Sequence, residues 1–99
     1  MGVRFIRKAR VKDGKRDEAL AFAADITAHW HETYGNEVTW GFELGGDQGT
    51  MYWMSDHDSL ASFEAEMMAS MDNAETGKIM SEAVGLFGPT QDKIVYTMG

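Results

Sequence analysis

The stretch that decides the fold runs from Gly49 to Met71 and reads Gly-Thr-Met-Tyr-Trp-Met-Ser-Asp-His-Asp-Ser-Leu-Ala-Ser-Phe-Glu-Ala-Glu-Met-Met-Ala-Ser-Met. Its first part, Thr50 to Met54, consists of residues that favour strands. Its second part carries an apolar stripe at helical spacing, formed by Leu60, Phe63, Met67 and Met71. Asp56 or Asp58 can cap this helix, but with Asp58 as the cap no capping box is present. The stretch therefore predicts a strand, a sharp turn and an amphipathic helix.

Upstream of this stretch the sequence predicts two strands around a long helix. Apolar and basic residues alternate from Val3 to Lys12, a strand pattern, and a Gly-containing turn follows. A helix is predicted from about Arg16 to Tyr34, where Gly35 ends it. A strand is predicted over Val38–Leu44, and the Gly-rich segment 45–49 joins it to the next strand as a hairpin.

Downstream, the sequence predicts one more helical segment and a last strand. The helical segment covers Lys78–Phe87 and ends at Gly88-Pro89. The strand covers Lys93–Met98. The resulting order βαββαβ predicts an α+β, ferredoxin-like fold for residues 1–99, a single domain with a four-stranded antiparallel sheet and its helices on one face.

The predicted sheet has apolar residues on both of its faces. In the third strand Met51 and Trp53 lie on one face, whereas Tyr52 and Met54 lie on the other. Helices cover only one face, and strands that are apolar on both sides need cover on both. A second copy of the sheet is the simplest other cover, so the sequence predicts a homodimer.

Composition narrows the function classes. The chain has 99 residues and no cysteine, which excludes a disulfide framework and thiolate chemistry. No apolar run is long enough for a membrane span, and the first ten residues resemble a strand rather than a signal peptide, so a cytoplasmic protein is expected. Seven of the nine basic residues lie in the first sixteen, yet the net charge is −7. Because the basic residues alternate with apolar ones, a strand is favoured over a nucleic-acid-binding arm.

The element order resembles the dimeric α+β barrel superfamily, as do Val-Lys-Asp-Gly-Lys at Val11–Lys15 and Trp53-Met54-Ser55 followed by Asp58-Ser59-Leu60-Ala61-Ser62-Phe63. This superfamily includes antibiotic-biosynthesis-type monooxygenases, haem-degrading monooxygenases and NIPSNAP-like proteins. The resemblance covers essentially the whole chain. It implies a homodimer with a small pocket between sheet and helices in each subunit.

The resemblance also bears on cofactors. Haem-degrading members use an Asn on the first strand, a Trp at the end of the third and a His on the second helix. Here Trp53 matches the Trp, Arg7 stands where the Asn would be, and the second helix has no His. The quinone-forming, cofactor-free members pair an Asn with a Trp and sometimes a Tyr. Trp53, Trp40 and Tyr52 resemble the aromatic residues of that set, without a matching Asn. No cofactor is therefore expected.

Three polar residues are candidates for chemistry, each with a structural alternative. Arg7 interrupts an apolar strand face; it either forms an ion pair with Asp25 or Glu43, lies at an exposed strand end, or anchors a ligand oxygen. His29, at the edge of the inward stripe of the first helix, is either a structural edge residue or a general base. His57 lies in an Asp-His-Asp sequence, but no ligand follows one helical turn later, so no metal site is predicted.

The predicted pocket lies between the first strand and the first helix and is closed by the second helix. We expect Arg7, His29, Trp53 and Tyr52 to be catalytic. The residues expected to bind the ligand are apolar: Phe5, Trp30, Trp40, Met67 and Met71. The predicted function is a cofactor-independent monooxygenase-like or cyclase-like enzyme acting on a small aromatic or polyketide-like substrate. The alternative is a non-catalytic, small-ligand-binding or stress-associated dimeric module.

Overall fold

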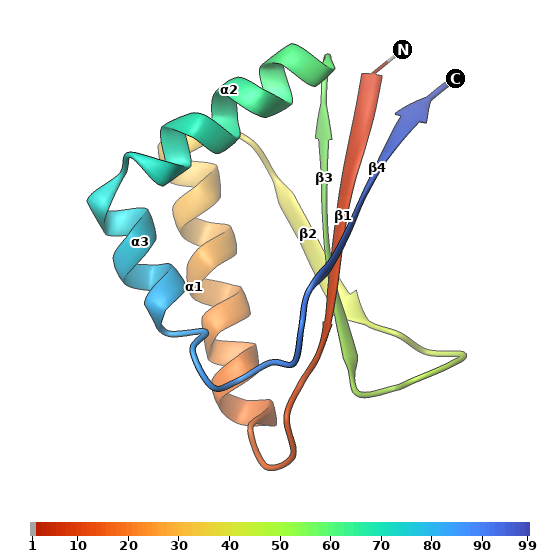
Figure 1. Cartoon of the computed structure of the whole chain (residues 1–99), viewed down its shortest axis with the longest axis vertical. Helices are drawn as coiled ribbons and strands as arrows, with labels where there is room; N and C mark the ends of the chain where they lie inside the picture. The colour runs from red at the N-terminus through yellow and green to blue at the C-terminus, as the bar shows by residue number, and fades with distance from the viewer. Residues whose placement is uncertain (1) are drawn as a thin grey trace.

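The computed structural model describes residues 2–99 and confirms the predicted ferredoxin-like arrangement. Its elements are β1 (Gly2–Arg10), α1 (Arg16–Tyr34), β2 (Val38–Phe42), β3 (Thr50–His57), α2 (Leu60–Met71), α3 (Ala74–Ser81) and β4 (Gln91–Thr97). The four strands form one antiparallel sheet in the order β2-β3-β1-β4. All three helices lie on one side of this sheet (Figure 1). None of the helices within residues 2–99 is long and apolar enough to cross a membrane.

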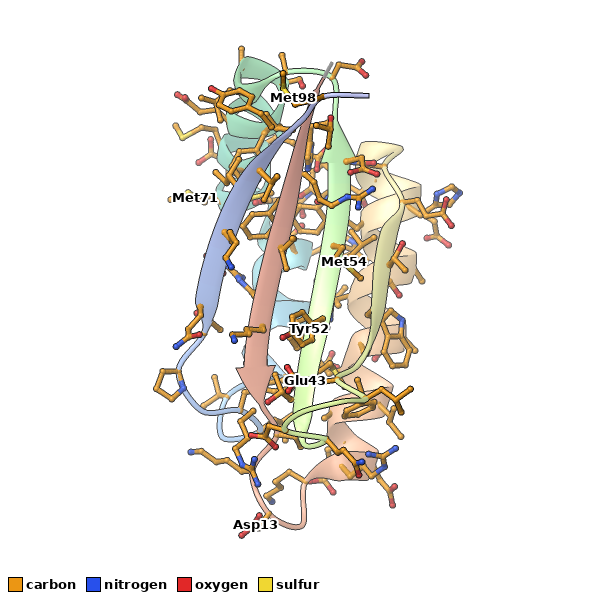
Figure 2. All side chains as sticks on the ribbon, turned by 90° about the vertical axis from the view of Figure 1, so that its right-hand side faces the viewer. Asp13, Glu43, Tyr52, Met54, Met71 and Met98 are labelled. Atoms are coloured by element: carbon orange, nitrogen blue, oxygen red, sulfur yellow. The ribbon has the colours of Figure 1, made fainter. Side chains whose placement is uncertain are left out.

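The central strand β3 divides its side chains between the two sheet faces. Met51, Trp53, Ser55 and His57 are buried, whereas the residues between them are half-buried or exposed. We call the buried side the covered face and the opposite side the open face. Strand β1 follows the same alternation, because the register pairs Phe5 with Ser55. Figure 2 views the open face, with the helices behind the sheet.

The hydrophobic core lies between the covered face and α1. Alanines at positions 9, 19 and 23 are almost completely buried, and their small size lets the helix approach the sheet closely. Beside them Phe22, Trp53 and Phe87 pack edge to face, with ring centroids 5.2–6.4 Å apart. Trp53 is therefore a core residue of the covered face.

Strand β4 is the least covered part of the sheet. It pairs only with β1, and most of its side chains are exposed on both faces. Ile94 and Tyr96 share the covered face with Phe5 and Val3, yet they remain 45% and 63% exposed. Within residues 2–99 of a single chain, therefore, the helices bury only part of the covered face, and no element packs on the open face.

Several predicted boundaries are wrong for identifiable local reasons. Strand β3 extends three residues beyond Met54, so the start of α2 is delayed. The cap of α2 is Ser59, not Asp56 or Asp58, and a capping box with Ser62 is present after all. The hydroxyl groups of Ser59 and Ser62 thus cap the helix, a role that the sequence predicted for a carboxylate.

The last helical segment also differs from its prediction. Helix α3 begins at Ala74, because the Asn73 side chain accepts from the backbone N–H groups of Glu75 and Thr76. It ends at Ser81 rather than Phe87, and Gly85 then adopts a positive φ of 81° that turns the chain. Leu86 is thereby buried in the core.

The strand ends shift by a few residues. The first two strands, predicted over Val3–Lys12 and Val38–Leu44, end at Arg10 and Phe42. Strand β4 covers Gln91–Thr97 instead of Lys93–Met98. These shifts leave the predicted pairing of the strands unchanged.

Candidate functional site

A cavity of about 490 Å³ lies between the covered face and the three helices, where the sequence predicted a pocket. This volume falls within the range of small-molecule sites. Helix α3 forms part of the wall, which the sequence did not predict. The lining residues are Phe5, Arg7, Ala9, Phe22, Ile26, Trp30, Val38, Trp53, Met54, Ser55, Met67, Ser70, Met71, Thr76, Gly77, Met80, Ala83, Phe87 and Thr90.

Five predicted site residues line this cavity besides Trp53: Phe5, Arg7, Trp30, Met67 and Met71. Phe5 packs on Phe63 of α2, with ring centroids 5.1 Å apart. Met71 lines the cavity although its side chain is 79% exposed, which places it at the opening. The lining is mainly apolar and aromatic, with methionines that adapt to the shape of a guest.

Asp25 or Glu43 was the ion-pair partner expected for Arg7 from the sequence. In the structure Arg7 pairs instead with Asp92 of β4. Its Nε and Nη2 groups donate to the two carboxylate oxygens at 2.8 and 2.9 Å. Residues 7 and 92 are direct cross-strand partners, which explains the pairing. These hydrogen bonds lower the pKa of the Asp92 carboxyl. The Nη1 group lies outside this pair, so the cavity wall carries a cation with one further donor group.

His29 is buried but does not line the cavity. Its Nε2 lies 2.6 Å from the hydroxyl of Thr76, and its Nδ1 lies 3.2 Å from the hydroxyl of Thr33. The Thr76 hydroxyl also lies 2.6 Å from the Tyr34 hydroxyl. Since Thr76 is a wall residue, the imidazole connects to the cavity through a hydroxyl rather than directly.

The Trp53 indole forms part of the cavity wall, as predicted. Its Nε1 is sealed from solvent, and no hydrogen-bond partner for it is present among residues 2–99. A buried donor without an acceptor costs about 1–3 kcal/mol. A ligand oxygen could satisfy this donor only if neighbouring side chains moved.

Two further predicted site residues, besides His29, do not line the cavity. Tyr52 lies on the open face, because residues 52 and 53 point to opposite sides of a strand. Its hydroxyl donates to Glu43 at 2.6 Å, and this bond raises the pKa of the phenol and lowers that of the carboxyl. Trp40 faces the helices beside Trp53 and packs on the core without lining the cavity.

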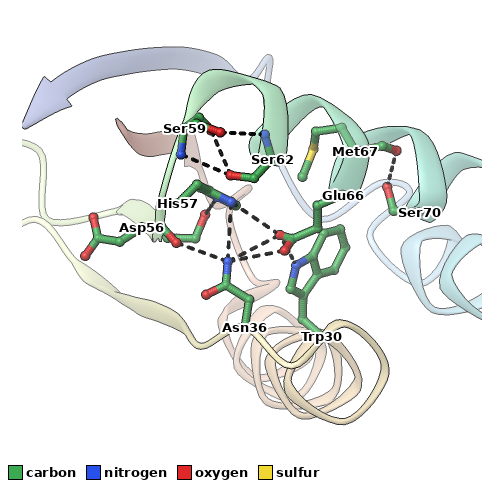
Figure 3. A network of polar contacts seen from close by, with 10 residues as sticks. Trp30, Asn36, Asp56, His57, Ser59, Ser62, Glu66, Met67 and Ser70 are labelled. Atoms are coloured by element: carbon green, nitrogen blue, oxygen red, sulfur yellow. Dashed lines mark hydrogen bonds and ion pairs between the residues drawn. The ribbon is translucent and has the colours of Figure 1, made fainter. Parts of the chain in front are cut away.

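A second polar network, which the sequence interpretation missed, joins β3 to α2. The Ser55 hydroxyl lies 2.8 Å from Nε2 of His57, and Nδ1 of His57 lies 3.8 Å from the Glu66 carboxylate. The side chains of His57 and Glu66 are only 2% and 14% exposed. Figure 3 shows this network between the start of α2 and the end of α1.

The Glu66 carboxylate is held from a second direction. Trp30 donates its indole N–H to Glu66 at 2.9 Å, and the Asn36 amide lies 3.4 Å from both carboxylate oxygens. The sequence signal for this network was the alternation in β3. Once the strand is extended to His57, residues 55 and 57 share the buried face with Trp53.

The polar groups do not assemble into a metal centre. Within residues 2–99, no group of three or more His, Asp or Glu side chains is arranged to hold a metal ion. The polar groups at and behind the cavity wall are hydroxyls, imidazoles and the Arg7 guanidinium.

Comparisons with known proteins give matches by structure alone. No family model matches the sequence, and no curated protein matches it. Protein Atu4242 from Agrobacterium tumefaciens, described as a NIPSNAP family protein with unknown function, superimposes with a TM-score of 0.83 at 16% identity, over 97% of this chain and 93% of that one. A NIPSNAP domain protein from Burkholderia xenovorans gives 0.84 at 12% identity, over 97% and 94%.

An enzyme is also among the similar structures. A mutant of SnoaB, a cofactor-independent oxygenase from Streptomyces nogalater, superimposes with a TM-score of 0.73 at 10% identity, over 99% of this chain and 94% of that one. At such identities the similarity is one of fold. It confirms the resemblance seen in the sequence: this chain has the fold of the dimeric α+β barrel superfamily, shared with NIPSNAP family proteins and a cofactor-independent oxygenase.

Proposed function

We propose that the protein binds a small aromatic or polyketide-like molecule in the cavity and acts on it as a cofactor-independent, monooxygenase-like or cyclase-like enzyme. The observation that carries this proposal is the cavity itself, whose apolar and aromatic wall holds a few polar side chains, among them Arg7 and Thr76. A few convergent polar groups in an apolar pocket are typical of small-molecule sites.

The wall favours a flat guest with one acidic oxygen. Trp53 and Phe5 offer aromatic surfaces, and Met67 adapts its shape to fill the remaining volume. The Arg7 guanidinium, held by Asp92, can donate from Nη1 to a phenolate or enolate oxygen. A phenol or enolisable ketone combines these properties.

The chemical step that the chain supplies is removal of a proton. A substrate hydroxyl next to Thr76 can transfer its proton to the threonine oxygen while the threonine proton moves to Nε2 of His29, which lies 2.6 Å away. The Tyr34 hydroxyl, at the same distance from Thr76, keeps that oxygen oriented. The resulting electron-rich anion is the form of an aromatic substrate that reacts with oxygen without a cofactor. SnoaB, of similar fold, is a cofactor-independent oxygenase.

Titration with a planar phenol tests the proposal. We expect 2-naphthol to quench the tryptophan fluorescence and oxygen to be consumed in its presence. Thr76→Val keeps the shape of the side chain but removes the hydroxyl, so turnover should fall by about 100-fold while the affinity stays within a factor of about three. Val84→Thr, on an exposed residue outside the cavity, is the control. Absence of quenching by 2-naphthol and related naphthoquinols would contradict the proposal.

A second candidate is the non-catalytic binding module. It is favoured by the pairing of Arg7 with Asp92 and by the position of His29 behind Thr76, since both groups already have partners. The same titration separates the two functions. Quenching without oxygen consumption or any change in the phenol would select the binding module.

The proposal includes a homodimer formed through the open face. Ile6, Tyr52 and Met54 form a half-buried apolar strip at its centre, and ion pairs such as Arg4–Asp56 flank this strip. An apolar centre with a charged rim is the usual composition of a protein interface. The dimer would cover the sheet face that the helices leave open.

A further inference from the structure

We propose that Ser55, His57 and Glu66 form a nucleophile–base–carboxylate relay, and that Ser55 attacks the carbonyl of an ester or thioester whose apolar acyl group occupies the cavity. The proposed proton transfer through Thr76 does not use this network. The inference rests on the proposed function only in requiring that the cavity admits an apolar guest.

The first argument is the distance between the nucleophile and the base. A serine hydroxyl becomes nucleophilic when an imidazole within hydrogen-bond distance accepts its proton. Here Oγ of Ser55 and Nε2 of His57 are 2.8 Å apart. Both side chains project from the same face of β3, and this strand pairs with β1 on one side and β2 on the other. Their mutual position is therefore fixed by the middle of the sheet.

The second argument is the orientation of the imidazole. With Nε2 facing the serine, Nδ1 faces the Glu66 carboxylate at 3.8 Å, an ion-pair distance. The Trp30 indole and the Asn36 amide hold this carboxylate in place. The Asn36 amide nitrogen, a donor, also lies 3.5 Å from Nδ1, so the relay uses the tautomer in which Nδ1 carries its proton toward Glu66. A buried carboxylate beside a histidine stabilises the imidazolium that forms when the serine loses its proton.

The third argument is access to the cavity. Ser55 belongs to the wall, whereas neither His57 nor Glu66 does, so the relay lies behind a single reactive position. Arg7 faces the same side of the sheet two residue pairs away, roughly 7 Å along the strands. Arg7 is held by Asp92 of β4, and in this proposal its Nη1 group, which that pair leaves free, stabilises the oxyanion. The apolar wall selects an aromatic or aliphatic acyl group.

The reaction balances without a cofactor. The Ser55 oxygen bonds to the carbonyl carbon, His57 takes the hydroxyl proton, and the bond to the alcohol or thiol leaving group breaks as His57 returns the proton to it. Water then attacks the Ser55 ester with His57 as base. The products are a carboxylic acid, the alcohol or thiol, and the unmodified serine.

A purely structural tie between α2 and the sheet would use the same contacts but would not make Ser55 reactive. Treatment with phenylmethanesulfonyl fluoride distinguishes the two roles: Ser55 replaces fluoride at sulfur, and His57 takes the proton. We expect one adduct per chain by intact mass, located at Ser55 by peptide mapping. Ser70 is the internal control, because it also lies at the cavity wall but its hydroxyl donates to the Met67 carbonyl. It should remain unlabelled.

Variants then test each role. Ser55→Ala should abolish labelling, and His57→Gln should slow it by about 100-fold. Glu66 is a positioning residue: for hydrolysis of 4-nitrophenyl butyrate, Glu66→Gln should lower kcat by about tenfold with KM unchanged. The exposed Ser81→Ala is the control and should react like the wild type. A loss of melting temperature in Glu66→Gln without a change in kcat would indicate a structural tie and overturn the proposal.

The outcomes also separate this proposal from the proposed function. An unlabelled Ser55 in a protein that still binds 2-naphthol overturns the relay and leaves the ligand-binding function standing. An unlabelled protein that binds no phenol overturns both. Labelling at Ser55 in a protein that consumes no oxygen supports the relay and removes the oxygenase reaction. Labelling that persists in Ser55→Ala contradicts the relay.

Discussion

The two faces of the sheet differ in how far their apolar side chains are buried within a single chain. On the covered face, Met51, Trp53 and the alanines of β1 and α1 are buried within a single chain. On the open face, Tyr52 and Met54, their neighbours in the same strand, are only half-buried and lie among charged residues. The two sets of side chains alternate along the same strand, so the difference in their burial comes from what packs on each face.

This difference separates stability from assembly. The covered face holds the core and the cavity, and changes there should act on the folding of each chain. The open face carries paired charges and a narrow apolar strip, and changes there should act on the association of two chains. Three pairs of substitutions, taken from the largest expected effect to the smallest, test this separation.

Trp53→Ala should lower the free energy of unfolding by about 3–5 kcal/mol, because it removes a large aromatic side chain that packs on Phe22 and Phe87. Urea denaturation measures this loss. Tyr52→Ala, one residue away on the open face, is the matched control and should cost clearly less. Equal losses for the two variants would mean that the faces do not differ.

Ile6→Asp should weaken the proposed homodimer by about 100-fold, which corresponds to about 2.7 kcal/mol, because it places an unpaired charge in the apolar strip. Sedimentation at several protein concentrations measures the change. Val84→Asp introduces the same charge at an exposed position outside the sheet and should leave the mass unaltered. A wild-type mass of one chain at micromolar concentration would refute the dimer itself.

Asp92→Asn and Asp56→Asn remove one ion pair from each face. Arg7 lowers the pKa of Asp92 in the folded protein, and Arg4 lowers that of Asp56. Each ion pair therefore stabilises the fold fully at pH values above 3.8, the ordinary pKa of aspartate. This stabilisation is lost as the pH falls through the lowered pKa of the folded state. At pH 7 Asp92→Asn should cost less than about 1 kcal/mol, since solvent screens this half-exposed pair. Asp56→Asn, in a more exposed pair, should cost still less. Denaturation at pH 7 and in acid should show that the loss of unfolding free energy in each variant, relative to the wild type, becomes smaller in acid. A loss that becomes larger in acid would contradict the predicted direction of the pH dependence.

Periodicity predicted the fold because the apolar stripes of β1, β3 and α1 are also the buried surfaces. It placed the cavity correctly for the same reason: alternation determines which side chains of β1 and β3 face the helices. Arg7 and Trp53 reach the cavity wall through that alternation. Local chemistry at the ends of elements was predicted less well, as the cap at Ser59 and the start of α3 show.

The polar networks could not be predicted from local patterns. His29 meets Thr76, 47 residues away in the sequence, and Arg7 meets Asp92, 85 residues away. Such pairs depend on strand register and on where a helix begins. The error at His57 was different in kind, because the strand was ended too early and the residue was assigned to a helix start.

Helix α2 contains no fully buried residue, although it forms one wall of the cavity. It is attached mainly by Phe63 against Phe5 and by the hydrogen bonds of Glu66. Regions with few buried contacts open locally before the rest of a protein unfolds. In hydrogen–deuterium exchange, the amides of α2 should therefore exchange far sooner than those of β1 and β3. A guest in the cavity would slow exchange in α2 first, so this helix would report occupancy before any chemistry is detected.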